Sequence, residues 1–326
     1  MLRSRFGKLA AFVLQLPLFL LFVLLTAGKN SSTMRVLVTG ANRGIGFAIV
    51  KAVLAHSPVT EVVLATRDLS TGRAAVEGLE DDEQRRRCSV VQLNVDSDES
   101  VAAAAETVRQ SGKRLYAIVN NAGCLAQSPE KVIETNLFGV KRVCDAFFPL
   151  LEENGGRVVM ISSGAASNFL SKCASERVQH MVGDDVTWED IKKLSAEFLA
   201  GGSGFGSEYD VTWTPYGFSK AALNSLTIAL SREHPALVIN ACSPGMIRTD
   251  LFADYAAQQG KSIDESIAAF GPKDPSESTV APLALLFRPR EDLKGLGLYY
   301  GSDGLRSPFA RYRQPNSPEY DGSQGR

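Results

Sequence analysis

The chain has 326 residues, of which 44% are hydrophobic and 22% charged, so it can bury a sizeable core and is not a disordered chain. Its 35 lysines and arginines nearly balance 36 aspartates and glutamates, for a net charge of −1. This excludes the basic surplus of a general nucleic-acid-binding protein. Five cysteines without a C-x-x-C pair and three widely separated histidines predict neither a disulfide framework nor a metal site.

An apolar segment stands apart at the N-terminus. Residues 9–27 form an uncharged run of 19 residues, preceded by Arg3, Arg5 and Lys8 and followed by Lys29. A helix of this length can cross a bilayer core of about 30 Å. The run fits a retained signal-anchor, a cleaved signal peptide or a buried core helix. We favour the anchor, because the run is long for a signal peptide and the folded pattern begins afresh after it.

The basic residues before this run favour a cytosolic N-terminus and a lumenal domain. We therefore expect residues 1–33 to anchor the protein in the membrane of the endoplasmic reticulum or the secretory pathway. Secretion, or release into the lumen of an organelle after cleavage, is the alternative.

From Arg35 onward, β-branched runs alternate with helical patterns. Strands are predicted at 35–39, 61–66, 90–95, 115–120, 157–162, 237–242 and 296–300. Helices are predicted at 45–55, 71–79, 97–110, 131–151 and 217–232. Strands that are apolar throughout and alternate with helices indicate a parallel sheet covered on both faces. The predicted fold class is α/β, a Rossmann-type doubly wound sheet of about seven strands in a single domain over 34–305. The polar tail 306–326 is expected to be loosely ordered.

The first strand-to-helix turn has the composition of a phosphate-binding loop. Residues 39–46 read TGANRGIG, with glycines in a G-x-x-x-G-x-G spacing. Small residues at such a turn let the backbone approach a pyrophosphate, whose charge the helix N-terminus stabilises. The predicted cofactor contacts here are Gly40, Asn42, Arg43, Gly44, Ile45 and Gly46.

The end of the second strand indicates which dinucleotide binds. An acidic residue there would bind the ribose hydroxyls of NAD, whereas arginine suits the 2′-phosphate of NADP. Arg67 follows this strand, and Arg43 in the glycine turn can reach the same group. The two arginines favour NADP(H), and Asp68 keeps NAD open as the alternative.

Taken in order, the motifs of the chain resemble those of the short-chain dehydrogenase/reductase family, and its carbonyl reductase branch most of all. The resemblance spans residues 34–305. It rests on TGANRGIG at 39–46, NNAG at 120–123, Asn136 in ETNLFG, Ser163 in VVMISS, Tyr216-x-x-x-Lys220, and Ser243-Pro244-Gly245 followed by Thr249. The glycine spacing disfavours a sugar-nucleotide epimerase of the extended branch.

The resemblance implies further cofactor contacts. They are Asn94 and Val95 near the adenine, Asn120, Ala122 and Gly123 after the fourth strand, Pro244, Gly245 and Thr249 near the nicotinamide, and Tyr216 and Lys220 themselves. Asn94 stands where the family usually has aspartate. A long insert at about 164–215 resembles that of carbonyl reductases, where it covers the family's dimerisation surface, and so implies a monomer. Within the insert, Thr187 is expected to cap a helix, with Asp190 completing a capping box.

Tyr216 and Lys220 lie four residues apart on a predicted helix, so they share one face. A lysine ammonium and a positive nicotinamide ring would lower the pKa of a tyrosine from its ordinary value of about 10. Tyr216 would then act as general acid, while Ser163 binds the substrate oxygen. Ser162 is the alternative to Ser163. The resemblance implies that Lys220 also binds the nicotinamide ribose and that Asn136 holds a water linking Lys220 to solvent.

The predicted function is NADP(H)-dependent reduction of a ketone or aldehyde, with a small-molecule carbonyl compound as the partner. Two alternatives remain open. The same four residues could oxidise a steroid, retinoid or other lipid alcohol, or the chain could bind NADPH without catalysis.

Overall fold

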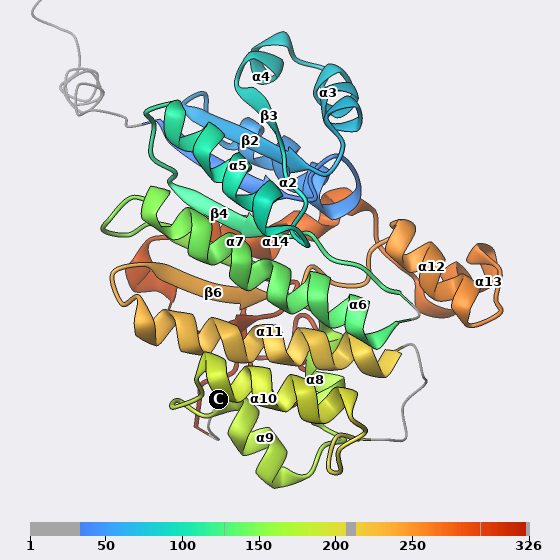
Figure 1. Cartoon of the computed structure of the whole chain (residues 1–326). Coiled ribbons are helices and arrows are strands. Elements are labelled where there is room, and N and C mark those ends of the chain that lie inside the picture. Colours follow the sequence, from blue (N-terminus) through green and yellow to red (C-terminus); the bar gives the residue numbers. More distant parts are fainter. Residues whose placement is uncertain (1–32, 127, 207–212, 294, 324–326) are drawn as a thin grey trace, which may run out of the picture. The chain divides into compact units, whose positions relative to one another are not determined.

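Eight strands form one sheet through the middle of the domain (Figure 1). They are β1 (Met34–Thr39), β2 (Thr60–Thr66), β3 (Cys88–Gln92), β4 (Ala117–Asn120), β5 (Arg157–Ile161), β6 (Val238–Cys242), β7 (Tyr299–Tyr300) and β8 (Arg306–Ser307). Their order in the sheet is β3-β2-β1-β4-β5-β6-β7-β8. All pairs are parallel except β7 with β8. The doubly wound α/β prediction is confirmed, with one antiparallel edge strand added.

This computed structural model describes residues 33–126, 128–206, 213–293 and 295–323. By its internal contacts the chain divides into two units, Met1–Thr33 and Met34–Arg326, and the sheet and its helices belong to the second. The predicted membrane segment, residues 9–27, lies outside the described residues. Within the described ranges, none of the helices has both the length and the apolarity needed to span a bilayer.

Helices cover both faces of the sheet (Figure 1). In chain order the helical elements are α2 (Gly44–His56), α3 (Leu69–Glu77), α4 (Asp82–Arg86), α5 (Asp98–Gln110), α6 (Pro129–Ile133), the π-helix η2 (Glu134–Phe138), α7 (Gly139–Phe147), η3 (Phe148–Leu150), α8 (Gly164–Leu170), α9 (Ser175–Val182), α10 (Trp188–Leu199), α11 (Trp213–Glu233), α12 (Asp250–Gln258), α13 (Ile263–Phe270), η4 (Pro275–Thr279), α14 (Val280–Phe287) and η5 (Arg290–Leu293).

Alternating side chains of β1 supply two separate cores, because successive residues of a strand point to opposite faces. Leu37 belongs to the core under α5, α7 and α11, whereas Val36 and Val38 belong to the core under α2 and α14. All three are completely buried. A sheet buried on both faces explains why the strand sequences are apolar throughout rather than alternating.

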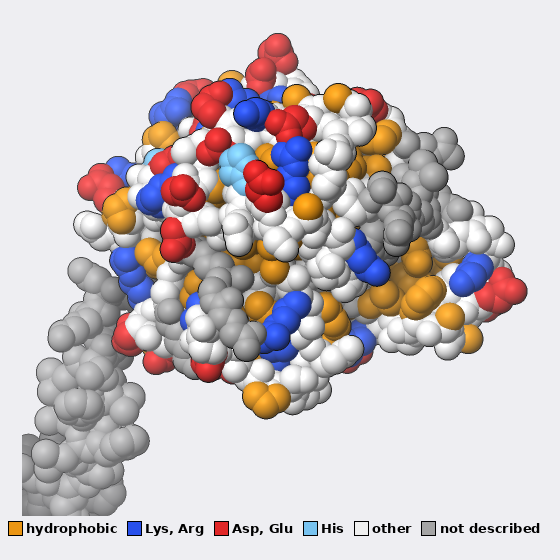
Figure 2. Space-filling view, turned by 90° about the horizontal axis from the view of Figure 1, so that it is seen from below, with side chains coloured by type: hydrophobic (Ala, Val, Ile, Leu, Met, Phe, Trp, Pro, Cys, Tyr) orange, Lys and Arg blue, Asp and Glu red, His pale blue; other side chains and the backbone are white. Residues whose placement is uncertain are grey.

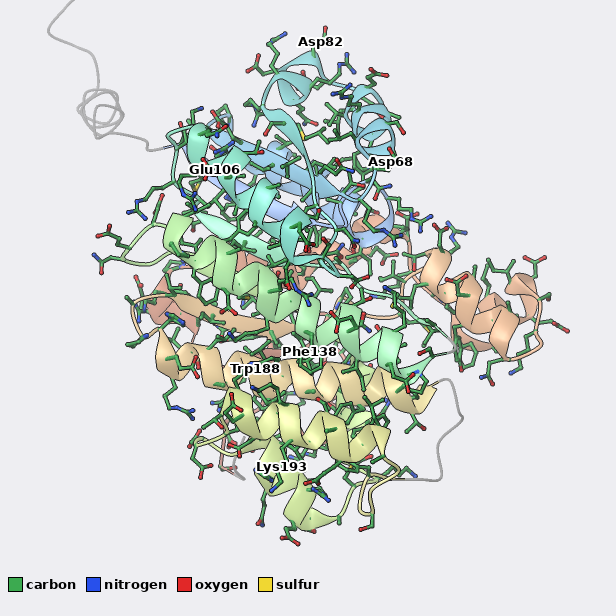
Figure 3. The ribbon with its side chains drawn as sticks, viewed as in Figure 1. Asp68, Asp82, Glu106, Phe138, Trp188 and Lys193 are labelled. Atoms are coloured by element: carbon green, nitrogen blue, oxygen red, sulfur yellow. The ribbon has the colours of Figure 1, made fainter. Side chains whose placement is uncertain are left out.

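The predicted insert forms α8, α9 and α10, which pack against α11. Thr187 caps α10 in a capping box with Asp190, as the sequence predicts. At the start of α10, Trp188 meets the ring of Phe138 edge-on at 5.3 Å between centroids (Figure 3). The insert therefore covers the outer surface of α11 and the adjoining η2.

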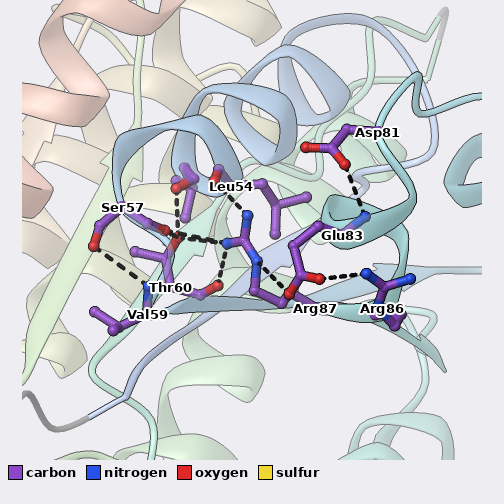
Figure 4. A network of polar contacts seen from close by, with 9 residues as sticks. Leu54, Ser57, Val59, Thr60, Asp81, Glu83, Arg86 and Arg87 are labelled. Carbon is purple, nitrogen blue, oxygen red and sulfur yellow. Dashed lines mark hydrogen bonds and ion pairs between the residues drawn. The ribbon is translucent and has the colours of Figure 1, made fainter.

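Arg87 contacts the end of α2, the start of β2 and helix α4 at the amino ends of the strands (Figure 4). Its guanidinium donates to the carbonyl oxygens of Leu54 at 3.0 Å, Ser57 at 3.2 Å and Thr60 at 2.7 Å. It also lies 3.9 Å from the carboxylate of Glu83 on α4. This cluster closes the C-terminal end of α2, at the sheet edge opposite the carboxyl ends of the strands.

The C-terminal tail differs from its prediction. Instead of being loosely ordered, residues 306–323 begin with β8 and pack on the domain, with Phe309 only 1% exposed. Two side-chain contacts hold the tail: the ring of Phe309 lies 5.9 Å from that of Tyr299, and Arg313 forms an ion pair with Asp303. A polar, proline-rich composition does not reveal such contacts.

Candidate active site

A cleft of about 1060 Å³ opens at the carboxyl ends of the parallel strands, where the strand order reverses between β1 and β4. In doubly wound folds ligands bind at this switch point. The cleft is lined by segments from the whole length of the domain, from Gly40 to Gln314. Every predicted site residue lines it except Asn120 and Asn136.

The glycine turn forms a cradle that only small residues permit. Gly40 and Gly44 have φ angles of +62° and +56°, which side-chain-bearing residues rarely adopt. A Cβ on Gly46 would lie 2.5 Å from both the Gly40 carbonyl oxygen and Nδ2 of Asn121. Arg43, at the N-cap of α2, makes no side-chain capping hydrogen bond. The N-terminal N–H groups of α2 are thus not capped by the Arg43 side chain, and the small residues let a ligand come close to the backbone. Both properties fit the pyrophosphate of a dinucleotide.

Asn121 connects the glycine turn to the end of β4 through hydrogen bonds. Its side-chain nitrogen donates to the carbonyl oxygens of Thr39 at 2.9 Å and Gly40 at 3.1 Å. Its backbone N–H and that of Ala122 both donate to Oγ1 of Thr39 at 3.0 Å. Sequence reasoning missed Thr39 and Asn121, although both lie within the two motifs that it used.

The side chain of Asn120 does not face the cleft, in contrast to its predicted role. It is 2% exposed, and its amide nitrogen points to the sulfur atoms of Cys144 and Met160. Because neighbouring residues of a strand face opposite ways, Asn120 faces the core while Asn121, just beyond the strand, reaches the cleft.

Two arginines line the outer end of the cleft. Arg67 follows β2 and is exposed, and Arg43 forms an ion pair with Asp250 at 2.6 Å, with both side chains about two-thirds exposed. Asp68 is engaged elsewhere: its carboxylate caps α3 by accepting hydrogen bonds from the backbone N–H and hydroxyl of Ser70, at 2.7 and 2.6 Å. These bonds lower the pKa of Asp68. The carboxylate of Asp68 is thus occupied with the helix, whereas Arg67 and the Asp250-paired Arg43 are the cationic side chains in this part of the cleft that could hold a 2′-phosphate.

Other predicted cofactor contacts lie along the same cleft. Asn42 donates to Oγ1 of Thr71 at 3.2 Å, and Oδ1 of Asn94 accepts from the N–H of Asp96 at 3.3 Å. The remaining lining residues of this group are Ile45, Val95, Gly123, Pro244, Gly245 and Thr249.

Ser163, Tyr216 and Lys220 come together at the inner end. Ser163 follows β5 and is hydrogen-bonded to the hydroxyl of Tyr216. Lys220, one turn along α11, lies 5.7 Å from the centre of the Tyr216 ring and donates to the carbonyl oxygen of Ile161 at 2.8 Å. The alternative, Ser162, is 2% exposed and donates to the backbone oxygen of Lys220 at 3.3 Å, so Ser163 is the serine that contacts Tyr216.

Burial dominates the titration of both groups. Burial raises the pKa of Tyr216 to about 12, and the hydrogen bond from Ser163 opposes this shift. Burial lowers the pKa of Lys220 to about 8. The expected lowering of the Tyr216 pKa is therefore not found in the protein alone, because loss of water around the phenolate outweighs the hydrogen bond from Ser163.

Asn136 lies in the π-helical turn η2 and is completely buried. Its Oδ1 accepts from the N–H of Cys124 at 2.8 Å, and its Nδ2 donates to the Cys124 carbonyl oxygen at 3.0 Å. A Cβ on the neighbouring Gly123 would lie 3.1 Å from Asn136 Oδ1 and 3.7 Å from Lys220 Nζ. Asn136 thus fixes the loop that faces Lys220. The predicted helix over 131–151 is divided into α6, η2 and α7, and the wide turn between them carries this asparagine.

Across the part of the chain that the structure describes, no group of three or more His, Cys, Asp or Glu side chains could hold a metal ion.

Comparison with known proteins agrees with the site. A family model described as short chain dehydrogenase matches residues 34–175. Carbonyl reductase (NADPH) 1 of Bos taurus is 31% identical over 281 residues, covering 80% of this chain and 94% of that protein. Carbonyl reductase (NADPH) 3 of Rattus norvegicus is 32% identical over 246 residues, covering 70% of this chain and 87% of that protein.

Solved structures share the fold. Menthone neomenthol reductase from Mentha piperita is 24% identical and superposes with a TM-score of 0.66, covering 84% of this chain and all of that one. The NADPH-bound carbonyl reductase from chicken fatty liver is also 24% identical, with a TM-score of 0.55, covering 83% of this chain and 97% of that one. The chain belongs to the short-chain dehydrogenase family. Within that family it is similar to the carbonyl reductases.

Proposed function

We propose that the protein is an NADP(H)-dependent oxidoreductase that reduces a ketone or aldehyde to the alcohol. The observation that carries the proposal is the contact of Ser163 with Tyr216, with Lys220 beside them, at the inner end of a cleft that continues to the glycine cradle. The similarity to carbonyl reductases named for NADPH supports it.

The cofactor would lie along the cleft. Its pyrophosphate would meet the cradle of Gly40, Gly44 and Gly46, and its 2′-phosphate would meet Arg43 and Arg67. When bound, NADPH supplies the hydride.

The residues of the chain supply the proton and orient the substrate. At neutral pH Tyr216 holds its proton, because burial has raised its pKa, so its hydroxyl is in the form that can donate to a substrate oxygen. Ser163 holds the same oxygen through its hydroxyl and stabilises negative charge that develops there. Lys220 places its amine next to Tyr216, and Asn136 fixes the backbone of Cys124 by a hydrogen bond. In the opposite direction the same groups would remove a proton from an alcohol.

Substitution of Tyr216 tests the proposal. Tyr216→Phe keeps the ring but removes the transferable proton, so we expect ketone-dependent NADPH consumption to fall at least about 100-fold. We expect NADPH binding, measured by its fluorescence, to change by less than about twofold. Tyr320→Phe is the matched control, since Tyr320 lies in the tail and does not line the cleft. Unchanged turnover by Tyr216→Phe would refute the role of this tyrosine, and absence of turnover by the parent protein in both directions would favour a non-catalytic NADPH-binding protein.

The direction of the reaction needs a separate measurement. Leu251 and Tyr255 pack against Tyr216, which suits an apolar substrate and keeps lipid alcohol oxidation as the second candidate. Initial rates with ketones and NADPH, and with the matching alcohols and NADP⁺, compare the two directions on one sample.

Two features outside the cleft belong to the same proposal. The apolar run 9–27 anchors the protein in a membrane of the secretory pathway with the domain on the lumenal side. This part of the proposal rests on the sequence. Digestion of the domain by protease added to intact microsomes would contradict it. Because the insert packs on α11, we expect the catalytic domain to be monomeric. Light scattering on residues 31–326 measures its molar mass and tests this expectation.

A further inference from the structure

The C-terminal tail reaches the inner end of the cleft. Tyr312 and Gln314 line the cleft together with Ser163, Gly164 and Tyr216, which lie about 100 to 150 residues earlier in the chain. The Tyr312 ring lies over Gly164, where a Cβ would be 2.7 Å from its Cε2 atom. Because Gly164 directly follows Ser163, the ring stands next to the serine that contacts Tyr216.

The backbone beside Tyr312 is held firmly. The next residue, Arg313, forms an ion pair with Asp303 in which the side chains are 7% and 12% exposed. Nε of Arg313 donates to Oγ of Ser307 at 2.9 Å, and the N–H of Asn316 donates to Asp303 at 2.8 Å. Burial opposes ionisation of Asp303, but these hydrogen bonds lower the pKa of its carboxyl. A buried, hydrogen-bonded ion pair fixes the chain direction at the position where Tyr312 leaves the tail.

Tyr312 itself is partly exposed at the cleft. It is 46% exposed, and Met246 and Phe270, which also line the cleft, are 42% and 39% exposed. Large apolar surfaces gathered on one concavity indicate a ligand-binding wall rather than scattered surface residues. Figure 2 shows apolar side chains gathered toward the right of the molecule, on the side where α12 and α13 lie.

Side chains of α12 also make the inner cleft apolar. Leu251 and Tyr255 of α12 pack in one cluster with Tyr216 and Ala165, and the ring of Tyr255 lies 5.9 Å from that of Phe270. A substrate carbonyl that reaches Ser163 and Tyr216 would therefore extend between α12 and the tail.

We propose that Tyr312 is a substrate-positioning residue, whose ring is the wall on which the apolar part of the substrate lies while its carbonyl meets Ser163 and Tyr216. The proposal rests on the function proposed above. Because the tail holds the Tyr312 ring in place, the ring limits which substituent of a ketone fits on the tail side of the cleft. It thereby influences which face of the carbonyl is presented for reduction.

Two variants change this wall in different ways. Tyr312→Ala removes the ring, and Gly164→Ala keeps it but forces it away from the serine. Leu199→Ala is the matched control, because Leu199 is similarly exposed at 39% but does not line the cleft. The probes are acetophenone, which carries a flat ring, and acetone, which does not.

With acetophenone and NADPH we expect the KM of both variants to rise about threefold to tenfold, the loss of one aromatic contact, while kcat changes less. We expect the KM for acetone and the binding of NADPH to stay within twofold. The ratio of the two 1-phenylethanol enantiomers should also shift, which a general loss of folding would not produce. An unchanged enantiomer ratio together with an unchanged KM for acetophenone would overturn the proposal.

Binding distinguishes this proposal from the proposed function. Titration of acetophenone into the NADP⁺-loaded protein by calorimetry needs no turnover. If the parent binds the ketone more tightly than Tyr312→Ala but reduces neither probe, the tail wall stands and the assignment as a reductase fails. Equal Kd values for the parent and Tyr312→Ala would overturn the role of Tyr312 whatever the activity.

Discussion

The buried ammonium of Lys220 lowers the free energy of unfolding by an amount that depends on pH. Lys220 is 4% exposed, and burial lowers its pKa from 10.5 to about 8. In the unfolded chain the same amine titrates near its ordinary value. Between pH 8 and 10.5 the unfolded state therefore holds a proton that the folded state has released, and the stability contributed by this group rises with pH across that window. Below pH 8 both states are protonated and the full cost remains.

The size of the effect follows from the shift. A displacement from 10.5 to about 8 corresponds to about 3 kcal/mol of destabilisation at pH 7, falling to about 2 kcal/mol at pH 9. Lys220→Met removes this cost together with the hydrogen bond to the Ile161 carbonyl oxygen. Because a neutral amine can still donate that bond, the hydrogen bond contributes little to the pH-dependent part. We expect the free energy of unfolding of the variant, minus that of the parent, to fall by about 1 kcal/mol from pH 7 to pH 9.

Urea denaturation of both proteins at pH 7 and pH 9, without cofactor, measures this difference. Tyr216 has a pKa raised to about 12 and titrates above this range in the folded state, and the other groups are common to both proteins and cancel. Lys193→Met is the control, since Lys193 is exposed on α10 (Figure 3). A difference for Lys220→Met that stays constant between the two pH values, as it should for Lys193→Met, would refute the burial of the ammonium as the cause.

Two further outcomes are expected. Arg67→Ala and Arg43→Ala should each raise the Kd for NADPH by about tenfold or more while changing the Kd for NADH by less than about threefold, since a charge-assisted hydrogen bond contributes about 1.5–3 kcal/mol. Fluorescence titration measures both constants, with Arg73→Ala as the control, since Arg73 is exposed and does not line the cleft. Equal loss for the two cofactors would contradict the 2′-phosphate assignment. Arg87→Leu should lower the free energy of unfolding by about 2–4 kcal/mol, because it removes the guanidinium that donates to the carbonyl oxygens of Leu54 and Thr60. It should leave the KM for NADPH unchanged, and an altered KM would show that the amino ends of the strands are coupled to the cleft.

The sequence predicted those features whose cause is local. The β-branched runs matched seven strands in the expected chain order because a sheet buried on both faces needs apolar residues at every position. The glycine turn was evident because the positive φ angles of Gly40 and Gly44 restrict the residue type. The cap of α10 by Thr187 was evident because a capping box lies within four residues.

What the sequence did not predict depends on side-chain contacts and burial that only the folded chain establishes. Asn120 and Asn121 are identical side chains in one motif, and only the end of β4 decides which of them faces the cleft. The tail was missed because its order depends on the pairing of Arg313 with Asp303 and on the burial of Phe309, neither of which has a sequence signature. The raised pKa of Tyr216 likewise depends on how completely the folded chain excludes water from it.

The docking of the tail also affects when the site is complete during synthesis. The cradle and the arginines lie within the first third of the domain, whereas one wall of the inner cleft comes from Tyr312. The glycine cradle and the two arginines are therefore synthesised long before Tyr312. Only when nearly all of the 326 residues have left the ribosome and Arg313 has met Asp303 does the cleft acquire its last wall. If Tyr312 positions the substrate as proposed, substrate selectivity therefore depends on a segment that is synthesised after the rest of the cleft.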